Sequence, residues 1–77
     1  MENWTYYIES DPKKLFGKPT IKGTRIAVDL ILEKLSYGES VDQLLKAYPQ
    51  LSEKSIRACL SYASETVKNE IVLPTAS

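Results

Sequence analysis

Three consecutive stretches with helical periodicity, each marked by a start signal, a stop signal or both, constrain the fold of this chain more than any other feature. The first begins at Val28 and stops at Gly38, where glycine suits the left-handed position after a helix. The second begins at Ser40 and is closed by Pro49. The third follows Ser52, a residue type favoured as an N-cap. The sequence therefore predicts three helices after residue 27.

Apolar residues recur at helical spacing within each stretch, and we expect these faces to build the core. The second helix also opens with a capping box, because Gln43 follows Ser40 by three residues. The expected core positions are Val28, Ile31, Leu32 and Leu35 in the first helix, Val41, Leu44, Leu45 and Tyr48 in the second, and Ile56, Leu60, Ala63 and Val67 in the third. The opposite side of the third helix is polar, so we expect it to face solvent.

The N-terminal part of the chain has strand-like and turn-like patterns instead. Residues 4–9 are rich in aromatic and β-branched types and predict a short strand that ends before Pro12. Residues 17–28 contain two glycines and a proline among short β-branched pieces, which favours a tight loop or small hairpin. Its end at residues 26–27 is expected to pair with the N-terminal strand, and the ribbon must pack on the helices to be stable.

The residue types present argue against an enzyme. Cys59 is the only cysteine, so an internal disulfide is impossible. Histidine is absent, which removes the commonest general base at neutral pH and the commonest metal ligand. The carboxylates are scattered along the chain rather than clustered. We therefore expect no catalytic site, no metal and no cofactor.

The chain's size and ends predict its organisation. Residues 1–70 are expected to form a single domain, and residues 71–77 a C-terminal tail. The first residues lack the basic-then-apolar order of a signal peptide, and no apolar stretch is long enough to span a bilayer, which predicts a soluble cytoplasmic protein. A core of this size is only marginally stable, so a homodimer or a docked partner is expected.

Charge is balanced overall but uneven along the chain. The formal net charge is zero, so the whole molecule exerts little pull on nucleic acid. Between residues 13 and 25, however, every charged side chain is basic: Lys13, Lys14, Lys18, Lys22 and Arg25. Lys18 and Lys22 either hold a phosphate backbone, as a wing does, or belong to a solvated structural turn. Arg25 is expected to clamp a carboxylate or a carbonyl within the fold.

The second and third helices, joined by a short turn, have the layout of a helix-turn-helix. In that arrangement the first turns of the third helix face the DNA major groove. The candidate contacts there are Ser52, Lys54, Ser55, Arg57, Ala58 and Ser61. The alternative is that this polar face is only the solvated surface of a small helical bundle.

Several short strings resemble one known family. They are GKPTIKGTRI at residues 17–26, GES at 38–40, YPQLS at 48–52 and ACLSYA at 58–63. In these strings the chain resembles the domain of unknown function 433 family, small bacterial and archaeal proteins similar to VapB-type antitoxins, from about Ile8 to Ala63. The resemblance implies a mainly α, three-helix homeodomain-like or winged-helix-like helix-turn-helix domain with a short N-terminal β-hairpin or ribbon.

The same resemblance implies a prokaryotic toxin–antitoxin pair. The helix-turn-helix would bind the operator DNA of its own operon, and another part would neutralise a PIN-like ribonuclease toxin. Ile71, Val72 and Leu73 in the tail are candidate anchors for that partner. The alternative function is a protein-only interaction module or a dimeric adaptor without DNA binding.

Overall fold

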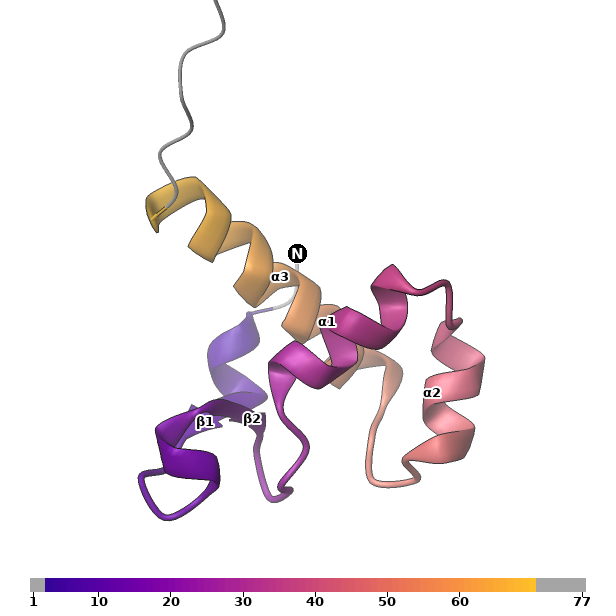
Figure 1. Ribbon diagram of the computed structural model, residues 1–77, viewed down its shortest axis with the longest axis horizontal. Helices are drawn as coiled ribbons and strands as arrows, with labels where there is room; N and C mark the ends of the chain where they lie inside the picture. The colour runs from indigo at the N-terminus through magenta and orange to yellow at the C-terminus, as the bar shows by residue number, and fades with distance from the viewer. Residues whose placement is uncertain (1–2, 71–77) are drawn as a thin grey trace, which may run out of the picture.

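The computed structural model describes residues 3–70, in which a small N-terminal sheet is followed by three helices (Figure 1). The first and third helices pack against the sheet, and the second packs against the third. The helices are α1 (Val28–Ser36), α2 (Val41–Ala47) and α3 (Glu53–Glu70). The strands are β1 (Ile8–Ser10) and β2 (Pro19–Ile21), and two short 3₁₀ helices are η1 (Trp4–Tyr6) and η2 (Leu15–Gly17). The expected fold class, mainly α with three helices and a short N-terminal ribbon, is confirmed.

The local signals at the ends of α1 and α2 act as the sequence predicts. The Ser40 hydroxyl accepts from the backbone N–H of Gln43 at 3.1 Å, and the Gln43 side chain accepts from the backbone N–H of Ser40 at 2.8 Å. Gly38 adopts a φ of +93° after α1 and donates its N–H to the carbonyl of Leu35 at 3.0 Å. Hydrogen bonds between residues close together in the sequence therefore stabilise the C-terminal end of α1 and the N-terminal end of α2.

The N-terminal strand is shorter than the residue types predict. Residues 4–6 form η1 rather than a strand, and β1 begins only at Ile8. The cause is Asn3, whose side-chain oxygen accepts from the backbone N–H of Thr5 at 3.1 Å and from its hydroxyl at 2.6 Å. This local cap stabilises a helical turn in a segment whose composition otherwise favours a strand.

The second correction concerns residues 26–27, which pair with β2 and not with the N-terminal strand. The partner of β1 is β2, in an antiparallel register that sets Ile8 opposite Ile21. A tight turn with Gly23 at a φ of +76° then brings the chain back along β2. There the N–H of Ile21 donates to the carbonyl of Ile26 at 3.0 Å. Since β2 already occupies the edge of β1, residues 26–27 pair with β2 instead.

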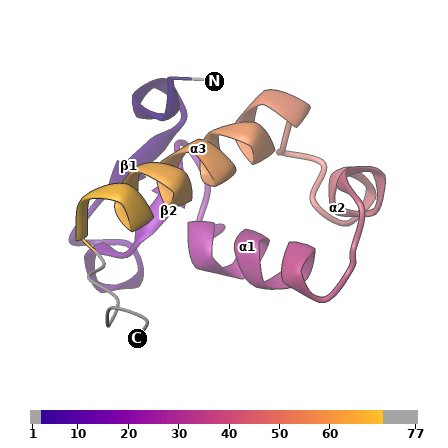
Figure 2. The ribbon, with the colours of Figure 1, turned by 90° about the horizontal axis from the view of Figure 1, so that it is seen from above.

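The core lies where α3 meets the rest of the molecule. Figure 2 shows α3 crossing over the sheet, with η1 on one side of the helix and α1 on the other. The α3 helix contacts η1, β1 and α1. The buried apolar residues are Ile8, Ile21, Ile26, Ala27, Val28, Ile31, Leu44, Leu51, Ile56, Ala58 and Cys59. The expected core positions of α1 and α2 lie in or against this cluster.

The expected core face of α3 is partly wrong. Ile56 is fully buried, but Leu60 is 48% exposed and Val67 is 57% exposed. The face that packs inward instead carries Ala58 and Cys59, both fully buried. Small side chains let the α3 backbone approach α1 and η1 closely, which a leucine face would prevent. Tertiary packing therefore decides which face of α3 is buried, and that face is not the most apolar one.

Candidate nucleic-acid interface

The turn between α2 and α3 sets the direction of α3. It occupies residues 48–52, and the backbone N–H of Leu51 donates to the carbonyl of Tyr48 at 3.0 Å. Leu51 is 8% exposed and belongs to the core cluster, while Tyr48 packs against that cluster. Because both ends of the turn are anchored in the core, the N-terminus of α3 is held in a fixed orientation on the molecular surface.

The first turn of α3 is closed by two serines. The Ser52 hydroxyl accepts from the backbone N–H of Ser55 at 3.1 Å, and the Ser55 hydroxyl accepts from the backbone N–H of Ser52 at 2.9 Å. This reciprocal pair is the geometry of a capping box, with serine in the position usually taken by Glu or Gln. Ser52 therefore caps α3 as the sequence predicts.

Two of the candidate DNA contacts on α3 are wrongly placed. Ser55 is only 4% exposed and Ser61 only 6% exposed, so neither hydroxyl faces a ligand outside the protein. Ala58, also named in that surface, is fully buried. The reason is the same rotation of α3 that exposes Leu60: small polar residues occupy the inward face. Ser55 serves the helix cap, and neither serine belongs to a surface site.

The two cations of the predicted recognition face do point to solvent. Lys54 and Arg57 are both exposed on the first two turns of α3. An Arg57 guanidinium nitrogen lies 2.8 Å from a carboxylate oxygen of Glu53, one helical turn earlier. Lys54 forms no ion pair with any residue that the structure describes. Lys54 therefore supplies uncompensated positive charge at this helix end, and Glu53 offsets the charge of Arg57.

The two candidate lysines of the N-terminal half differ in the same way. The Lys18 ammonium lies 2.7 Å from a carboxylate oxygen of Asp29, in the first turn of α1, and both side chains are more than half exposed. Lys22 is exposed and has no ion-pair partner within residues 3–69. Lys22 is thus the freer of the two for a phosphate contact.

Arg25 does not clamp the fold from inside. Its side chain is exposed and forms no hydrogen bond or ion pair with any described residue, so that expectation is wrong. The turn is held by Thr24 instead. The Thr24 hydroxyl donates to the carbonyl of Ile21 at 2.7 Å and accepts from the backbone N–H of Ile26 at 3.0 Å. Because Thr24 fixes the backbone, the Arg25 guanidinium is left in solvent.

Glu9 joins the two basic loops, a role that the sequence analysis missed. One Glu9 carboxylate oxygen lies 3.3 Å from the Lys14 ammonium and accepts from the backbone N–H of Gly23 at 3.4 Å. The Lys14 ammonium also lies within hydrogen-bond distance of the Thr24 carbonyl, at 3.4 Å. The loops of residues 11–18 and 22–25, called the basic loop pair below, are therefore tied together.

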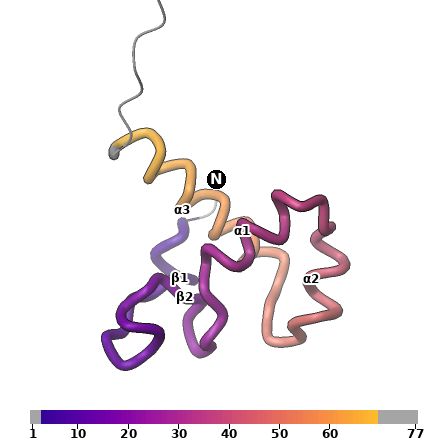
Figure 3. Tube along the Cα trace, viewed as in Figure 1, coloured from indigo at the N-terminus to yellow at the C-terminus, as the bar shows by residue number. Residues whose placement is uncertain are grey.

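The basic loop pair and the α2–α3 turn lie along one edge of the molecule. Figure 3 shows these segments at the lower end of the trace, in a row from the basic loop pair to the turn of residues 48–52. Within the basic loop pair, Lys13, Lys22 and Arg25 are exposed and have no ion-pair partner among residues 3–69. This edge therefore presents a local excess of positive charge on a protein whose formal charge is zero.

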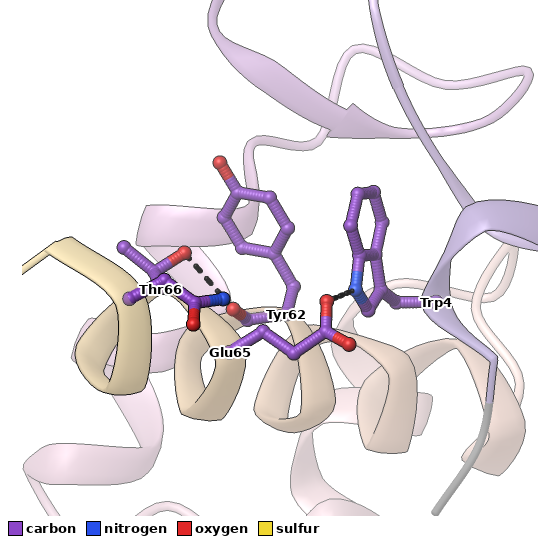
Figure 4. A pocket seen from close by; sticks show the side chains of 5 residues that line it. Trp4, Tyr62, Glu65 and Thr66 are labelled. Carbon is purple, nitrogen blue, oxygen red and sulfur yellow. Dashed lines mark hydrogen bonds between the residues drawn. The ribbon is translucent and has the colours of Figure 1, made fainter.

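A shallow pocket of about 190 Å³ lies on another part of α3 (Figure 4). Its wall contains Trp4, whose indole N–H donates to the carboxylate of Glu65. The Trp4 and Tyr62 rings meet edge to face, with centroids 5.0 Å apart and planes at 86°. Thr66 uses its hydroxyl within α3, donating to the Tyr62 carbonyl at 3.0 Å. The contacts of Trp4 with Tyr62 and Glu65 hold η1 against α3, so the residues that line the pocket have a structural role.

The described residues include no group of three or more metal-ligating side chains placed to hold a metal ion. Cys59 is fully buried, and burial raises the pKa of its thiol from 9.0 to about 11. A thiol that stays protonated inside the core is a poor nucleophile.

None of the helices within residues 3–70 is both long and apolar enough to cross a bilayer. The candidate partner anchors Ile71, Val72 and Leu73 lie outside the described residues.

These features define a small, mainly helical domain in which two helices and a short turn present a basic edge. The chain belongs to the family described as "Protein of unknown function (DUF433)", which matches residues 8–63. The family expected from the motif at residues 17–26 is therefore confirmed.

The chain is similar to one curated protein and to one solved structure. The uncharacterized protein y4eO of Sinorhizobium fredii (strain NBRC 101917 / NGR234) is 36% identical over 56 residues, which cover 73% of this chain and 25% of the relative. The chain thus spans about a quarter of the length of that curated relative. The crystal structure of a DUF433 member from Anabaena variabilis ATCC 29413 superposes with a TM-score of 0.74 at 26% identity, over 79% of this chain and 60% of that chain.

Proposed function

We propose that this protein is a DNA-binding antitoxin that acts in the cytoplasm. The proposal is that it binds the operator of its own operon and neutralises a PIN-like ribonuclease toxin. The observation that carries the DNA half is the basic edge, where Lys54 on the capped end of α3 and Lys22 on the basic loop pair are exposed without ion-pair partners among the described residues. The toxin half is carried by the resemblance to VapB-type antitoxins. A homodimer would add the avidity that a formally neutral monomer lacks.

The test of DNA binding is a salt titration against duplex DNA from upstream of the chain's own gene. Each phosphate contact releases counterions, so the logarithm of the binding constant should fall linearly with the logarithm of salt concentration, between about 50 and 200 mM. The double variant Lys54→Ala/Arg57→Ala should bind at least about tenfold more weakly, with a shallower salt slope.

The matched control is Lys68→Ala, because Lys68 is an exposed cation on the same helix but lies more than three turns from Lys54. Its affinity should stay close to that of the wild type. Glu53→Gln should bind about two- to threefold more tightly, since it removes the carboxylate that offsets Arg57. If the wild type does not bind the upstream duplex, the proposal of operator binding by this edge is wrong. It is also wrong if every variant binds with the affinity and salt slope of the wild type.

A second candidate is a protein-only interaction module, and one observation favours it. Leu60 and Val67 are two exposed apolar side chains on α3, seven residues apart, with the polar Ser64 between them. Exposed apolar side chains at heptad spacing are typical of helices that pack against another helix. Copurification with the neighbouring gene product, lost in Leu60→Lys but kept in Lys54→Ala/Arg57→Ala, together with no DNA shift, would favour this candidate.

A further inference from the structure

The tip of the first basic loop carries an aromatic side chain with no cover. Phe16 is fully exposed, at 104% of its reference area, and the neighbouring Leu15 is 39% exposed. By contrast, Trp4 and Tyr7, also in the N-terminal part, pack against the core cluster. A phenylalanine that makes no use of its apolar surface within its own fold has that surface available for a partner.

The backbone holds Phe16 in this position at a cost. Leu15 has a φ of +48°, Phe16 of +57° and Gly17 of +81°, so three successive residues lie in the left-handed region. Side chains other than glycine are disfavoured there, and such residues persist only where the surroundings fix them. The N–H of Gly17 donates to the Lys14 carbonyl at 3.0 Å, and that of Lys18 to the Leu15 carbonyl at 3.1 Å. These hydrogen bonds keep the tip folded.

The charged side chains of the basic loop pair indicate what kind of partner would bind the Phe16 ring. The cations without ion-pair partners among residues 3–69 in this part of the chain are Lys13, Lys22 and Arg25. Two acids lie in or beside the loop that carries the ring. Glu9 pairs with Lys14 and accepts from the N–H of Gly23. Asp11 accepts from the backbone N–H of Lys13 at 2.9 Å. A partner that meets both the ring and the cations must combine negative charge with apolar surface. Nucleic acid has both, in its phosphates and its bases.

We propose that Phe16 is an intercalating side chain, which enters duplex DNA between base steps while the cations of the basic loop pair hold the adjacent phosphates. This inference rests on the DNA binding proposed above and assigns the loop a second task besides backbone contact. Apolar wedges of this kind unstack a base step and bend the duplex toward the major groove. The strained backbone presents the ring ready for insertion.

The experiment measures affinity for the upstream duplex by fluorescence anisotropy. Phe16→Ala should weaken binding about tenfold without changing the salt slope, because a phenyl ring releases no counterions. Lys22→Ala should lower the slope by about one. The matched control is Tyr37→Ala, which removes an aromatic ring that is 78% exposed at the end of α1 and should leave affinity unchanged.

Two further variants separate the ring from the backbone. Phe16→Trp should keep the affinity, and its emission should be quenched on DNA binding beyond the change that Trp4 gives in the wild type. Phe16→Gly relieves the left-handed strain, so it should raise the melting temperature while binding DNA as weakly as Phe16→Ala. A stable fold with weak binding excludes misfolding as the cause.

The failures are distinguishable. If the wild type binds the duplex and Phe16→Ala binds equally well, the intercalation proposal is overturned and the proposed function stands. If the wild type does not bind duplex DNA, both are overturned. If Phe16→Ala keeps its DNA affinity but no longer copurifies with the toxin, Phe16 is a protein contact and the proposal is overturned.

Discussion

At the scale of single residues, two buried threonines in one short segment behave in opposite ways. Thr20 is fully buried, and its hydroxyl has no hydrogen-bond partner among the residues that the structure describes. Thr24 is 9% exposed, and its hydroxyl makes hydrogen bonds to the backbone of Ile21 and Ile26. A buried hydroxyl without a partner costs free energy, whereas one that completes a turn stabilises it. Similar burial therefore leads to opposite expectations for the same substitution.

Thr20→Val should raise the free energy of unfolding by about 1 kcal/mol, since valine has nearly the same shape and no unsatisfied oxygen. Thr24→Val should lower it by about 1–3 kcal/mol, because the N–H of Ile26 loses its partner and the Ile21 carbonyl keeps only the backbone N–H of Thr24. Urea denaturation followed by circular dichroism measures both. Equal effects of the two substitutions would show that the hydroxyl hydrogen bonds do not decide stability here.

At the scale of elements, α3 gives a second pair of contrasting substitutions. Ile56 is fully buried, while Leu60, one turn later, is 48% exposed. Ile56→Val removes one methylene group from the core and should cost about 1 kcal/mol. Leu60→Ala removes more atoms yet should cost only about 0.5 kcal/mol, because much of that side chain already faces water and alanine favours helix. The urea midpoints of the two variants test this order; the reverse order would mean that α3 packs through Leu60.

The elements also show what could be predicted from sequence. The ends of α1 and α2 were predictable, because Gly38, Ser40 and Gln43 act through bonds to close neighbours. The Glu53–Arg57 ion pair joins residues four positions apart, a spacing that favours such pairs on a helix, but it was not among the predictions. The buried face of α3 was not predictable from sequence. Two faces of this helix could be buried, and contacts with α1 and η1 determine which one is.

For the candidate site too, local features were predicted correctly and features that depend on tertiary packing were not. Exposure of Lys54 and Arg57 followed correctly from helical periodicity, while the burial of Ser55 and Ser61 depended on the rotation of α3. The left-handed backbone at Phe16 was not predictable, because a non-glycine residue gives no local signal for a positive φ. What the sequence missed was thus set by distant packing or by strain.

At the scale of the whole molecule, Cys59 reports on unfolding. Its thiol is fully buried within the cluster that joins the helices and the sheet. A reagent such as Ellman's reagent attacks a thiolate and must first reach the sulfur. Labelling of the native protein at pH 8 should therefore be roughly 100-fold or more slower than in urea, as expected for a domain stabilised by about 3–5 kcal/mol. Rapid labelling in the absence of urea would mean that the α3 side of the core opens locally.

The same thiol makes stability depend on pH in a defined direction. Burial raises the pKa of Cys59 from 9.0 to about 11, so between these pH values the unfolded chain loses this proton and the folded chain keeps it. Stability falls wherever the folded state binds more protons, so this contribution is fully present below pH 9 and is lost as pH rises toward 11. Between pH 8 and about 10.5 the wild type should lose more free energy of unfolding than Cys59→Ala. The difference between the two losses isolates the thiol from the tyrosines and lysines, which both proteins share, and equal losses would contradict a buried, protonated Cys59.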